Sequence, residues 1–292
     1  MTAAAAEAVR DAPTDSVTFA FADASAQLYG LARLGLSRAA GEARQGSALA
    51  LLFAGREPVA AHARGALPVA DDASWESLAL GGLHATVEAP LDRWTLRFDG
   101  DDGHGFALEL AALGGAAALD ADAPAGRLGG MAGYDQPCRV TGSVRAGGRE
   151  RAFDGLGQRG HAWGHADWER IELARTVTAW TDGGCAALTA IRPAGAGDHG
   201  RDATWAALWE PEGVLEVHDG RLSTTYDAEG HPRRAGLELW ASGAEWPRRA
   251  AGDVLCGSSL ELGSLRLDCS FFRWHLEGRT GVGRYDILRR AA

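Results

Sequence analysis

The strongest constraint on the fold is the alternation of apolar and polar residues along many short stretches of the chain. Residues 94–98 and 106–110 are apolar at every second position, which is typical of strands with one buried face. Similar runs occupy residues 17–21, 134–144 and 237–241. No stretch keeps the 3.6-residue period of a long amphipathic helix. The pattern predicts an all-β protein of the sandwich or barrel type.

Turn residues and one change of phase refine this prediction. The apolar runs on either side of Asp219-Gly220 predict a β-hairpin over residues 214–225. Residues 113–130 consist almost entirely of Ala, Gly, Asp and Pro, and we expect a loop there. At Phe271-Phe272 the alternation slips by one residue, which predicts either a β-bulge or a strand that is apolar on both sides.

The chain length allows one large domain or two domains of ordinary size. With 292 residues the chain can bury a hydrophobic core that needs no disulfide or metal to stabilise it. The two halves carry similar numbers of expected strands. We therefore predict two β-domains, at residues 16–148 and 149–292, preceded by a disordered tail at residues 1–15.

Charge and composition exclude several classes of function. The net charge of -10 argues against nucleic-acid binding, which needs a basic surface. The chain contains no lysine and no asparagine, so all of its positive side-chain charge at neutral pH comes from arginine. Schiff-base catalysis by lysine and N-glycosylation are therefore excluded.

The cysteines and the N-terminus point to an ordinary cytoplasmic protein. Cys138, Cys185, Cys256 and Cys269 lie far apart and form no Cys-x-x-Cys pair, so we expect four buried free thiols. The N-terminus lacks a basic start followed by an apolar segment, and no apolar run approaches about 18 residues. We expect neither a secretory signal nor a membrane insertion.

The residues best suited to catalysis or ligand binding lie close together in the centre of the chain. Residues 155–168, Gly-Leu-Gly-Gln-Arg-Gly-His-Ala-Trp-Gly-His-Ala-Asp-Trp, place two His, two Trp, one Arg and one Asp among four Gly. Glycine permits tight or positive-φ turns. We therefore expect a closely folded segment that brings these aromatic and titratable side chains together.

Three interpretations of this segment are open. His161, His165 and Asp167 share a parity on an extended chain and resemble a metal-ligand set, although we expect no metal. Alternatively, His161 or Asp167 holds or donates a proton in a partly dry pocket between Trp163 and Trp168. In the third interpretation the segment is a tight corner, in which both Trp side chains fill the core.

Two other motifs carry less weight. The chain has no Gly-x-Ser-x-Gly elbow, which weakens a prediction of Ser-His-Asp hydrolysis. Gly155-x-Gly157-x-x-Gly160 matches the dinucleotide fingerprint only formally, because no βαβ unit surrounds it. We expect no cofactor.

Residues 157–164, Gly-Gln-Arg-Gly-His-Ala-Trp-Gly, followed by Asp167-Trp168, resemble the signature of a known family. This is the lipocalin-like family that includes carotenoid 1,2-hydratase (hydroxyneurosporene synthase) and AttH-like proteins, with the pattern Gly-x-Gly-x-x-Asp-His-x-Trp-Gly. Weaker matches lie at residues 134–142, 19–30 and 281–287. One departure is that Gly160 stands where the signature has an aspartate.

The resemblance implies two lipocalin-like β-domains with a hydrophobic pocket. It further implies a cofactor-free enzyme, a hydratase or cyclase, that protonates an alkene of an isoprenoid or polyene substrate before hydration or ring closure. We expect His161 and Asp167 to be catalytic, with Asp167 replacing the aspartate missing at Gly160. The residues expected to contact the substrate are Tyr29, Tyr134, Gln136, Arg159, Trp163, Trp168 and Trp274.

Two alternatives follow from the same resemblance. A non-catalytic lipocalin-like protein would bind an apolar ligand and return it unchanged, and Gly160 favours this alternative. A pericyclase, similar to a Diels–Alderase, would only shape a polyene and would need no acid.

Overall fold

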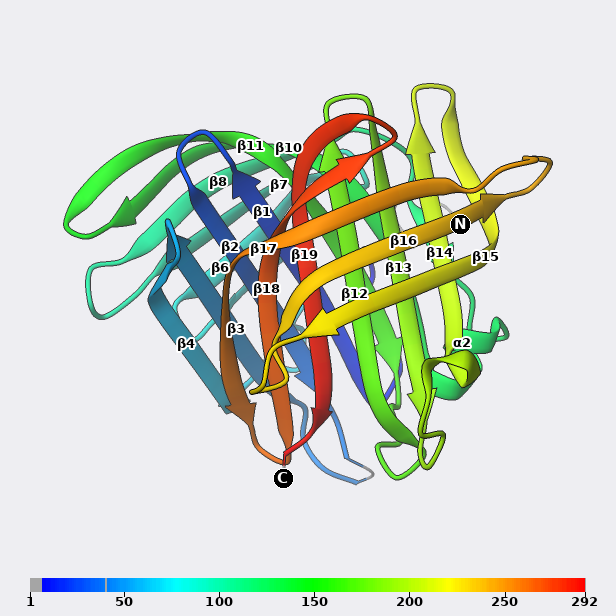
Figure 1. Cartoon of the computed structure of the whole chain (residues 1–292). Coiled ribbons are helices and arrows are strands. Elements are labelled where there is room, and N and C mark those ends of the chain that lie inside the picture. Colours follow the sequence, from blue (N-terminus) through cyan, green and yellow to red (C-terminus); the bar gives the residue numbers. More distant parts are fainter. Residues whose placement is uncertain (1–6, 40, 292) are drawn as a thin grey trace. The chain divides into compact units, whose positions relative to one another are not determined.

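The computed structural model describes residues 7–39 and 41–291, and nearly all of its regular structure is β-strand. The chain divides into two compact units (Figure 1). The first contains the residues up to Ala116 and Gly133–His165. The second contains Ala117–Ala132 and the residues from Ala166 onward. The all-β prediction with two barrel-like sheets is confirmed.

The first unit is built on one antiparallel sheet with the strand order β4-β3-β2-β1-β11-β10-β8-β7-β6-β5. This sheet nearly closes on itself. The approach of β3 to β5 shows this: a Cβ added at Gly46 of β3 would lie 2.8 Å from the side chain of Leu80 in β5. The strands are β1 (Thr14–Asp23), β2 (Leu28–Ser37), β3 (Gln45–Ala54), β4 (Glu57–Pro68), β5 (Ser77–Leu80), β6 (Leu83–Ala89), β7 (Arg93–Asp99), β8 (Gly105–Ala112), β10 (Met131–Ala146) and β11 (Arg149–Gly164).

Alternate residues of these strands form the core of the first unit. Val17, Phe19 and Phe21 of β1 are buried in it. The Phe21 ring packs edge-on against Phe106 and Phe153, at centroid distances of 5.1 and 5.4 Å. Such edge-to-face pairs stabilise a core beyond their buried area.

The second unit contains a closed barrel in which β12 to β19 follow chain order. β19 returns to β12, and Tyr285 pairs with Val177. Its elements are β9 (Ala117–Leu119), α2 (Pro124–Gly129), β12 (Ile171–Thr181), β13 (Gly184–Pro193), η1 (His199–Arg201), β14 (Ala203–Glu210), β15 (Gly213–Tyr226), β16 (Pro232–Ala241), β17 (Arg248–Leu262), β18 (Leu265–Leu276) and β19 (Arg279–Arg290). Figure 1 shows β12 to β19 in green through red.

The boundary between the units differs from the predicted one at 148/149. β11 pairs with β1 from Ala22–Leu156 to Thr14–Gly164, so the backbone hydrogen bonds of this strand place it in the first unit. The segment 117–132, in contrast, belongs to the second unit. Neither shift was visible in the sequence, because strand pairing over more than 100 residues leaves no local signal.

The predicted tail at residues 1–15 is wrong for the part that the structure describes; residues 1–6 lie outside that part. Glu7 and Asp15 are only 4% and 2% exposed, and β1 already begins at Thr14. Hydrogen bonds to these two carboxylates, described below, hold the segment in place.

The predicted hairpin at residues 214–225 is also wrong. β15 runs through Asp219-Gly220 as one strand, pairing first with β14 and then with β16. A register shift between Val217 and Asp219 marks a bulge instead of a turn. A Cβ at Gly220 would lie 3.1 Å from both Ala206 and Leu188, so the glycine lets the bent strand approach its neighbours.

Three smaller predictions have clear outcomes. The segment 113–130 is not only loop, because it contains β9 and the short helix α2, which begins at Pro124 and ends before Gly130 (φ 63°). At Phe271-Phe272 the second alternative holds, because both side chains are fully buried; the register shift opposite them lies in β17, between Val254 and Cys256. The four cysteines are free and buried, as predicted.

No helix in residues 7–39 or 41–291 combines the length and the apolar character needed to cross a membrane.

Candidate functional site

The central glycine-rich segment forms an extended strand instead of the expected closely folded corner. Up to Gly164 it lies within β11. Added Cβ atoms would lie 2.1 Å from the Ala22 carbonyl oxygen at Gly155 and 2.3 Å from the Ala20 carbonyl oxygen at Gly157. The glycines therefore let a neighbouring backbone approach, and only Gly164 has a positive φ, of 142°.

The register of β11 against β1 decides which side chains enter the first barrel. His161 pairs with Val17 and Arg159 with Phe19, and both partners belong to the core. Cross-strand partners point to the same face. Arg159 and His161 therefore point inward, and they are 1% and 0% exposed.

His161 is bound to a carboxylate that the sequence did not single out. Its Nε2 lies 2.6 Å from Oδ1 of Asp15. The other carboxylate oxygen of Asp15 accepts hydrogen bonds from Trp75 Nε1 at 2.9 Å and from the backbone N–H of Arg10 at 2.7 Å. Burial alone would raise the pKa of Asp15, but the hydrogen bonds, first that with His161, lower it below its usual 3.8. Asp15 is thus held as an anion.

Aromatic rings surround the His161 imidazole. The ring centroids of Trp75, Tyr134 and Trp163 lie 5.9, 5.7 and 5.1 Å away, each in an edge-on arrangement. The guanidinium carbon of Arg10 lies 4.3 Å from the centroid of Trp163. The contact between Arg10 and Trp163 is a cation–π interaction.

A second buried ion pair lies in the same unit. Arg159 binds Glu7 through Nη2 and donates through Nη1 to the Tyr134 hydroxyl. Its guanidinium carbon lies 4.7 Å from the centroid of Trp94. Glu7 also accepts from Trp94 Nε1 at 3.2 Å and from the Leu91 backbone N–H at 3.1 Å. Burial raises the pKa of Tyr134 to about 12 although Arg159 lowers it, so the phenol keeps its proton.

The inward-facing residues that were expected to bind substrate therefore have partners within the protein. Gln136 donates to the carbonyl oxygens of Leu91 and Gly114 at 3.0 and 2.8 Å. Tyr134, Arg159 and Trp163 take part in the contacts above. Their role in substrate binding stays a prediction, and the structure gives each of them a structural role as well.

The position of the missing signature aspartate is filled from the neighbouring strand. A Cβ added at Gly160 would lie 2.6 Å from Oδ1 of Asp135 in β10. The Asp135 carboxylate thus occupies the space that a side chain at residue 160 would enter. Gly160 and Asp135 are both partly exposed, unlike His161, which alternates with Gly160 along β11.

Two of the remaining predicted site residues lie in a turn after β11, and a third lies on the other face of the first sheet. Asp167 lies after the end of β11 and accepts the backbone N–H of Glu169 at 3.0 Å, as turn-forming aspartates commonly do. Trp168 follows in the same turn. Tyr29 alternates with Leu28, a core residue, so it points to the opposite face of the first sheet.

Trp274, which was expected in the pocket wall, belongs to the core of the second barrel. It is fully buried and stacks on Phe272 with a centroid distance of 5.6 Å. Phe272 and Trp274 share one face of β18, and this face is filled by the protein itself.

One more carboxyl with unusual surroundings lies in β19. Asp286 is contacted by Arg284 Nε at 3.3 Å. Burial raises the pKa of Asp286, although the charge of Arg284 and a hydrogen bond from the Cys269 thiol lower it. Desolvation of this kind favours a protonated carboxyl.

The metal interpretation finds no cluster to support it in the described part of the chain. Within residues 7–39 and 41–291, no three His, Cys, Asp or Glu side chains are arranged so that they could hold a metal ion. His165 lies beyond the end of β11 and is exposed, so the parity shared with His161 is broken at Gly164.

A family model matches almost the whole chain. Residues 6–291 match the model of a family described as a domain of unknown function, DUF7064, and the chain belongs to this family. No curated protein has a matching sequence.

Solved structures show the same fold at low sequence identity. NE1406 of Nitrosomonas europaea, assigned as an AttH, is 12% identical with a TM-score of 0.74, covering 98% of this chain and 95% of that one. CghA, solved with the compound Sch210972, is 14% identical with a TM-score of 0.62, covering 96% and 89%. CghA alone gives a TM-score of 0.61 at the same identity and coverage. The chain thus has the two-barrel, lipocalin-like fold of these proteins.

Proposed function

We propose that this chain is a cofactor-independent enzyme that protonates an alkene of an apolar isoprenoid or polyene substrate, with Asp135 as the proton donor. One observation carries this proposal: the Asp135 carboxylate lies where a side chain at Gly160 would point. The resembling signature has an aspartate there. A carboxyl at Asp135 of β10 thus lies in nearly the same space as a carboxyl at residue 160 of β11 would, although the two positions are far apart in the sequence.

The surroundings support this assignment. Asp135 is partly exposed, whereas His161 is sealed inside the barrel. A proton donor has to reach its substrate within hydrogen-bond distance. We assign the Asp15–His161 pair a positioning role, in which it holds β1 against β11 behind Gly160. CghA, which has a similar fold, was solved with the compound Sch210972. This similarity supports a small-molecule ligand for the present chain.

The chemistry needs only this carboxyl and water. The Asp135 proton is transferred to one alkene carbon, and a carbocation forms at the other. Water then adds to the cation and returns a proton to the Asp135 carboxylate, which completes a hydration. Attack by a second double bond of the same substrate, followed by proton loss to Asp135, gives a ring isomer.

The test is turnover of a panel of isoprenoids and polyenes, followed by liquid chromatography and mass spectrometry. The wild type should form products that have gained one water or that are isomers of the substrate. Asp135→Asn and Asp135→Gly should each lower turnover on the order of 100-fold or more. The double variant Asp135→Gly with Gly160→Asp should recover activity, because it returns the carboxyl to the signature position. Circular dichroism and the unfolding midpoint confirm folding.

Other variants decide between this proposal and the competing ones. Asp167→Asn is the matched control and should keep wild-type turnover; a loss there, with Asp135→Asn active, would return the acid role to Asp167. A loss confined to Asp286→Asn would assign it to Asp286. Isomers formed equally by Asp135→Asn would indicate a pericyclase, and a compound bound but unchanged would indicate a binding protein.

A further inference from the structure

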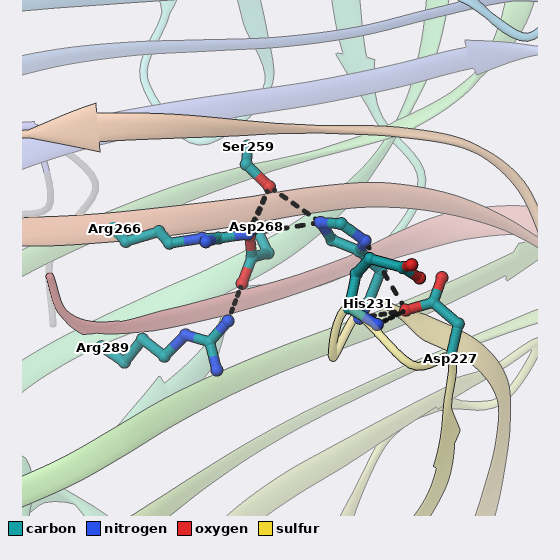
Figure 2. A network of polar contacts seen from close by, with 7 residues as sticks. Asp227, His231, Ser259, Arg266, Asp268 and Arg289 are labelled. Carbon is teal, nitrogen blue, oxygen red and sulfur yellow. Dashed lines mark hydrogen bonds and ion pairs between the residues drawn. The ribbon is translucent and has the colours of Figure 1, made fainter. Parts of the chain in front are cut away.

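Arginines in the interior of this protein are paired with carboxylates. The buried arginines of the described chain each contact an Asp or Glu side chain; they are Arg159, Arg175 and Arg284. A polar network in the second barrel follows the same rule (Figure 2). Its Asp268 carboxylate accepts hydrogen bonds from Arg266 Nε at 2.8 Å and from Arg289 Nη2 at 3.0 Å. Such pairing offsets the cost of removing a charge from water.

Arg33 of β2 departs from this rule. The protein around its guanidinium lowers the pKa of Arg33 by desolvation, and no nearby charge opposes this effect. Within residues 7–39 and 41–291, Arg33 forms neither an ion pair nor a side-chain hydrogen bond. A desolvated cation without a counter-charge is unfavourable for the folded state. Perturbed groups of this kind are typical of ligand sites.

The Arg33 side chain is accessible, although the strands around it are buried. Arg33 is the one exposed residue among residues 28–36 of β2, and Thr18 is the one partly exposed residue among residues 15–23 of β1. Thr18 pairs with Arg33 on one side and with Gly160 of β11 on the other. Cross-strand partners point to the same face. Accessibility in β1 and β2 is therefore confined to a row that leads from Arg33 to Gly160.

This row connects Arg33 with the proposed proton donor. The Asp135 carboxylate lies over Gly160, where an added Cβ would be 2.6 Å from its Oδ1. Because β1 lies between β2 and β11, two strand spacings, roughly 10 Å, separate Arg33 from Gly160. Arg33 and Asp135 form no ion pair with each other. Thr18 lies between them with a small side chain, which leaves room for a substrate.

Gly35 determines where the guanidinium of Arg33 lies. A Cβ added at Gly35 would lie 3.4 Å from Arg33 Nη1 and 2.6 Å from Ser47 Oγ of β3. The guanidinium and the Ser47 hydroxyl are thus next to each other above the same glycine. A guanidinium binds one carboxylate through two parallel hydrogen bonds, and a hydroxyl can donate a third. A phosphate group carries about two negative charges, and no second cation acts on the pKa of Arg33, so a carboxylate fits better.

We propose that Arg33 anchors the substrate of the Asp135 site, and that this substrate is an isoprenoid or polyene carboxylic acid. This inference rests on the proposed function and adds the substrate class to it. The Arg33 guanidinium and the Ser47 hydroxyl hold the carboxylate. The apolar chain then runs over Thr18 toward Asp135, so the double bond that receives the proton lies several bonds from the carboxylate. The distance between anchor and acid selects that double bond.

The test is equilibrium binding to the full chain, followed by the fluorescence of its ten tryptophans. The probes are retinoic acid, farnesoic acid and the methyl esters of both. The wild type should bind the acids roughly 10- to 100-fold more tightly than the esters. Arg33→Met should lose this preference and bind the esters as the wild type does. Arg33→Lys should be intermediate, because it keeps the charge but loses the bidentate geometry.

Two further variants complete the design. Arg97→Met, at an exposed position of β7, is the matched control and should bind all four probes as the wild type does. Asp135→Asn separates this inference from the proposed function, because the anchor stays intact when the acid is lost. It should keep the preference for acids. A preference for acids in a protein without turnover would support the anchor and contradict the acid role of Asp135.

Equal affinity of the wild type for acids and esters would overturn the inference, and so would binding of neither acid. Unchanged affinity of Arg33→Met for the acids would overturn it as well. Unfolding midpoints give a second readout. Without ligand, Arg33→Met should be at least as stable as the wild type, since it removes a desolvated charge. Farnesoic acid should raise the midpoint of the wild type and not that of Arg33→Met. A lower midpoint of ligand-free Arg33→Met would assign Arg33 a structural role and contradict the proposal.

Discussion

His161 Nε2 and Asp15 Oδ1 lie 2.6 Å apart although 146 residues separate them in the chain. Both side chains are buried, with 0% and 2% exposure. The contact connects the beginning of β1 to the end of β11, the two strands that meet in the middle of the first sheet. It therefore ties the chain segment after Glu7 to the glycine-rich segment at the end of β11.

Replacing Asp15 by Asn should destabilise the protein and change its response to acid. Loss of the charged acceptor should cost about 1.5–3 kcal/mol at pH 7. Because the folded-state pKa of Asp15 is below 3.8, its ionisation stabilises the folded state above pH 3.8. That stability is lost as the pH falls from 3.8 through the folded pKa. Urea unfolding at several pH values should show this loss in the wild type and not in Asp15→Asn.

The matched control is Asp154→Asn in β11. Asp154 forms a 2.5 Å ion pair with Arg139, but 61% of its side chain is exposed. Exposed pairs contribute about 0–1 kcal/mol. Equal losses of stability in both variants at pH 7 would contradict the role assigned to the buried pair.

Removing the carboxylate of Glu7 should have a larger effect. Glu7→Ala leaves the Arg159 guanidinium buried without its counter-charge, which should cost about 3–5 kcal/mol. It should also release the segment before β1, so hydrogen exchange of the backbone near Leu91 should accelerate. Glu57→Ala, at an exposed position, is the control. A difference below about 1 kcal/mol between the two variants would show that Arg159 is stabilised by other means.

Much of this architecture could be predicted from the sequence because strands with one buried face leave a local signal. The alternation at residues 17–21 and 94–98 gave strands that the structure contains, and Phe271-Phe272 marked a strand buried on both sides. The central segment was also recognised as chemically rich. Local rules failed at Asp219-Gly220, since a turn and a bulged strand share the same residue types.

The candidate site could be predicted only in part, because its contacts depend on strand register. His161 and Trp163 were found, but Asp15 reaches His161 only through the pairing of β1 with β11. Its place at the start of the alternation Asp15, Val17, Phe19 was a usable signal that it faces inward. Asp135 could not be connected to Gly160, because a sequence does not show which strand lies beside which.

Two glycines should respond differently to an added methyl group. In Gly283→Ala the new Cβ would lie 1.8 Å from the Thr178 carbonyl oxygen, a backbone atom in the next strand that cannot rotate away. In Gly160→Ala it would meet the carboxylate of Asp135, which can turn aside. We expect a loss of about 3 kcal/mol or more for Gly283→Ala and about 1 kcal/mol or less for Gly160→Ala. Thermal and urea unfolding measure both.

The same pair tests the proposed acid. If turnover depends on the position of the Asp135 carboxyl, Gly160→Ala should lose activity while staying folded. Unchanged turnover in Gly160→Ala would mean that this position does not matter for the reaction.

The last prediction concerns Asp286, whose pKa is raised above 3.8 by burial. Below pH 3.8 the folded and unfolded states both carry the protonated acid. As the pH rises from 3.8 through the folded pKa, only the unfolded state loses the proton, so the folded state loses relative stability. The free energy of unfolding of the wild type, measured against Asp286→Asn in urea from pH 3 to pH 7, should therefore decrease with pH. The opposite slope would mean that Arg284 outweighs desolvation and holds Asp286 ionised.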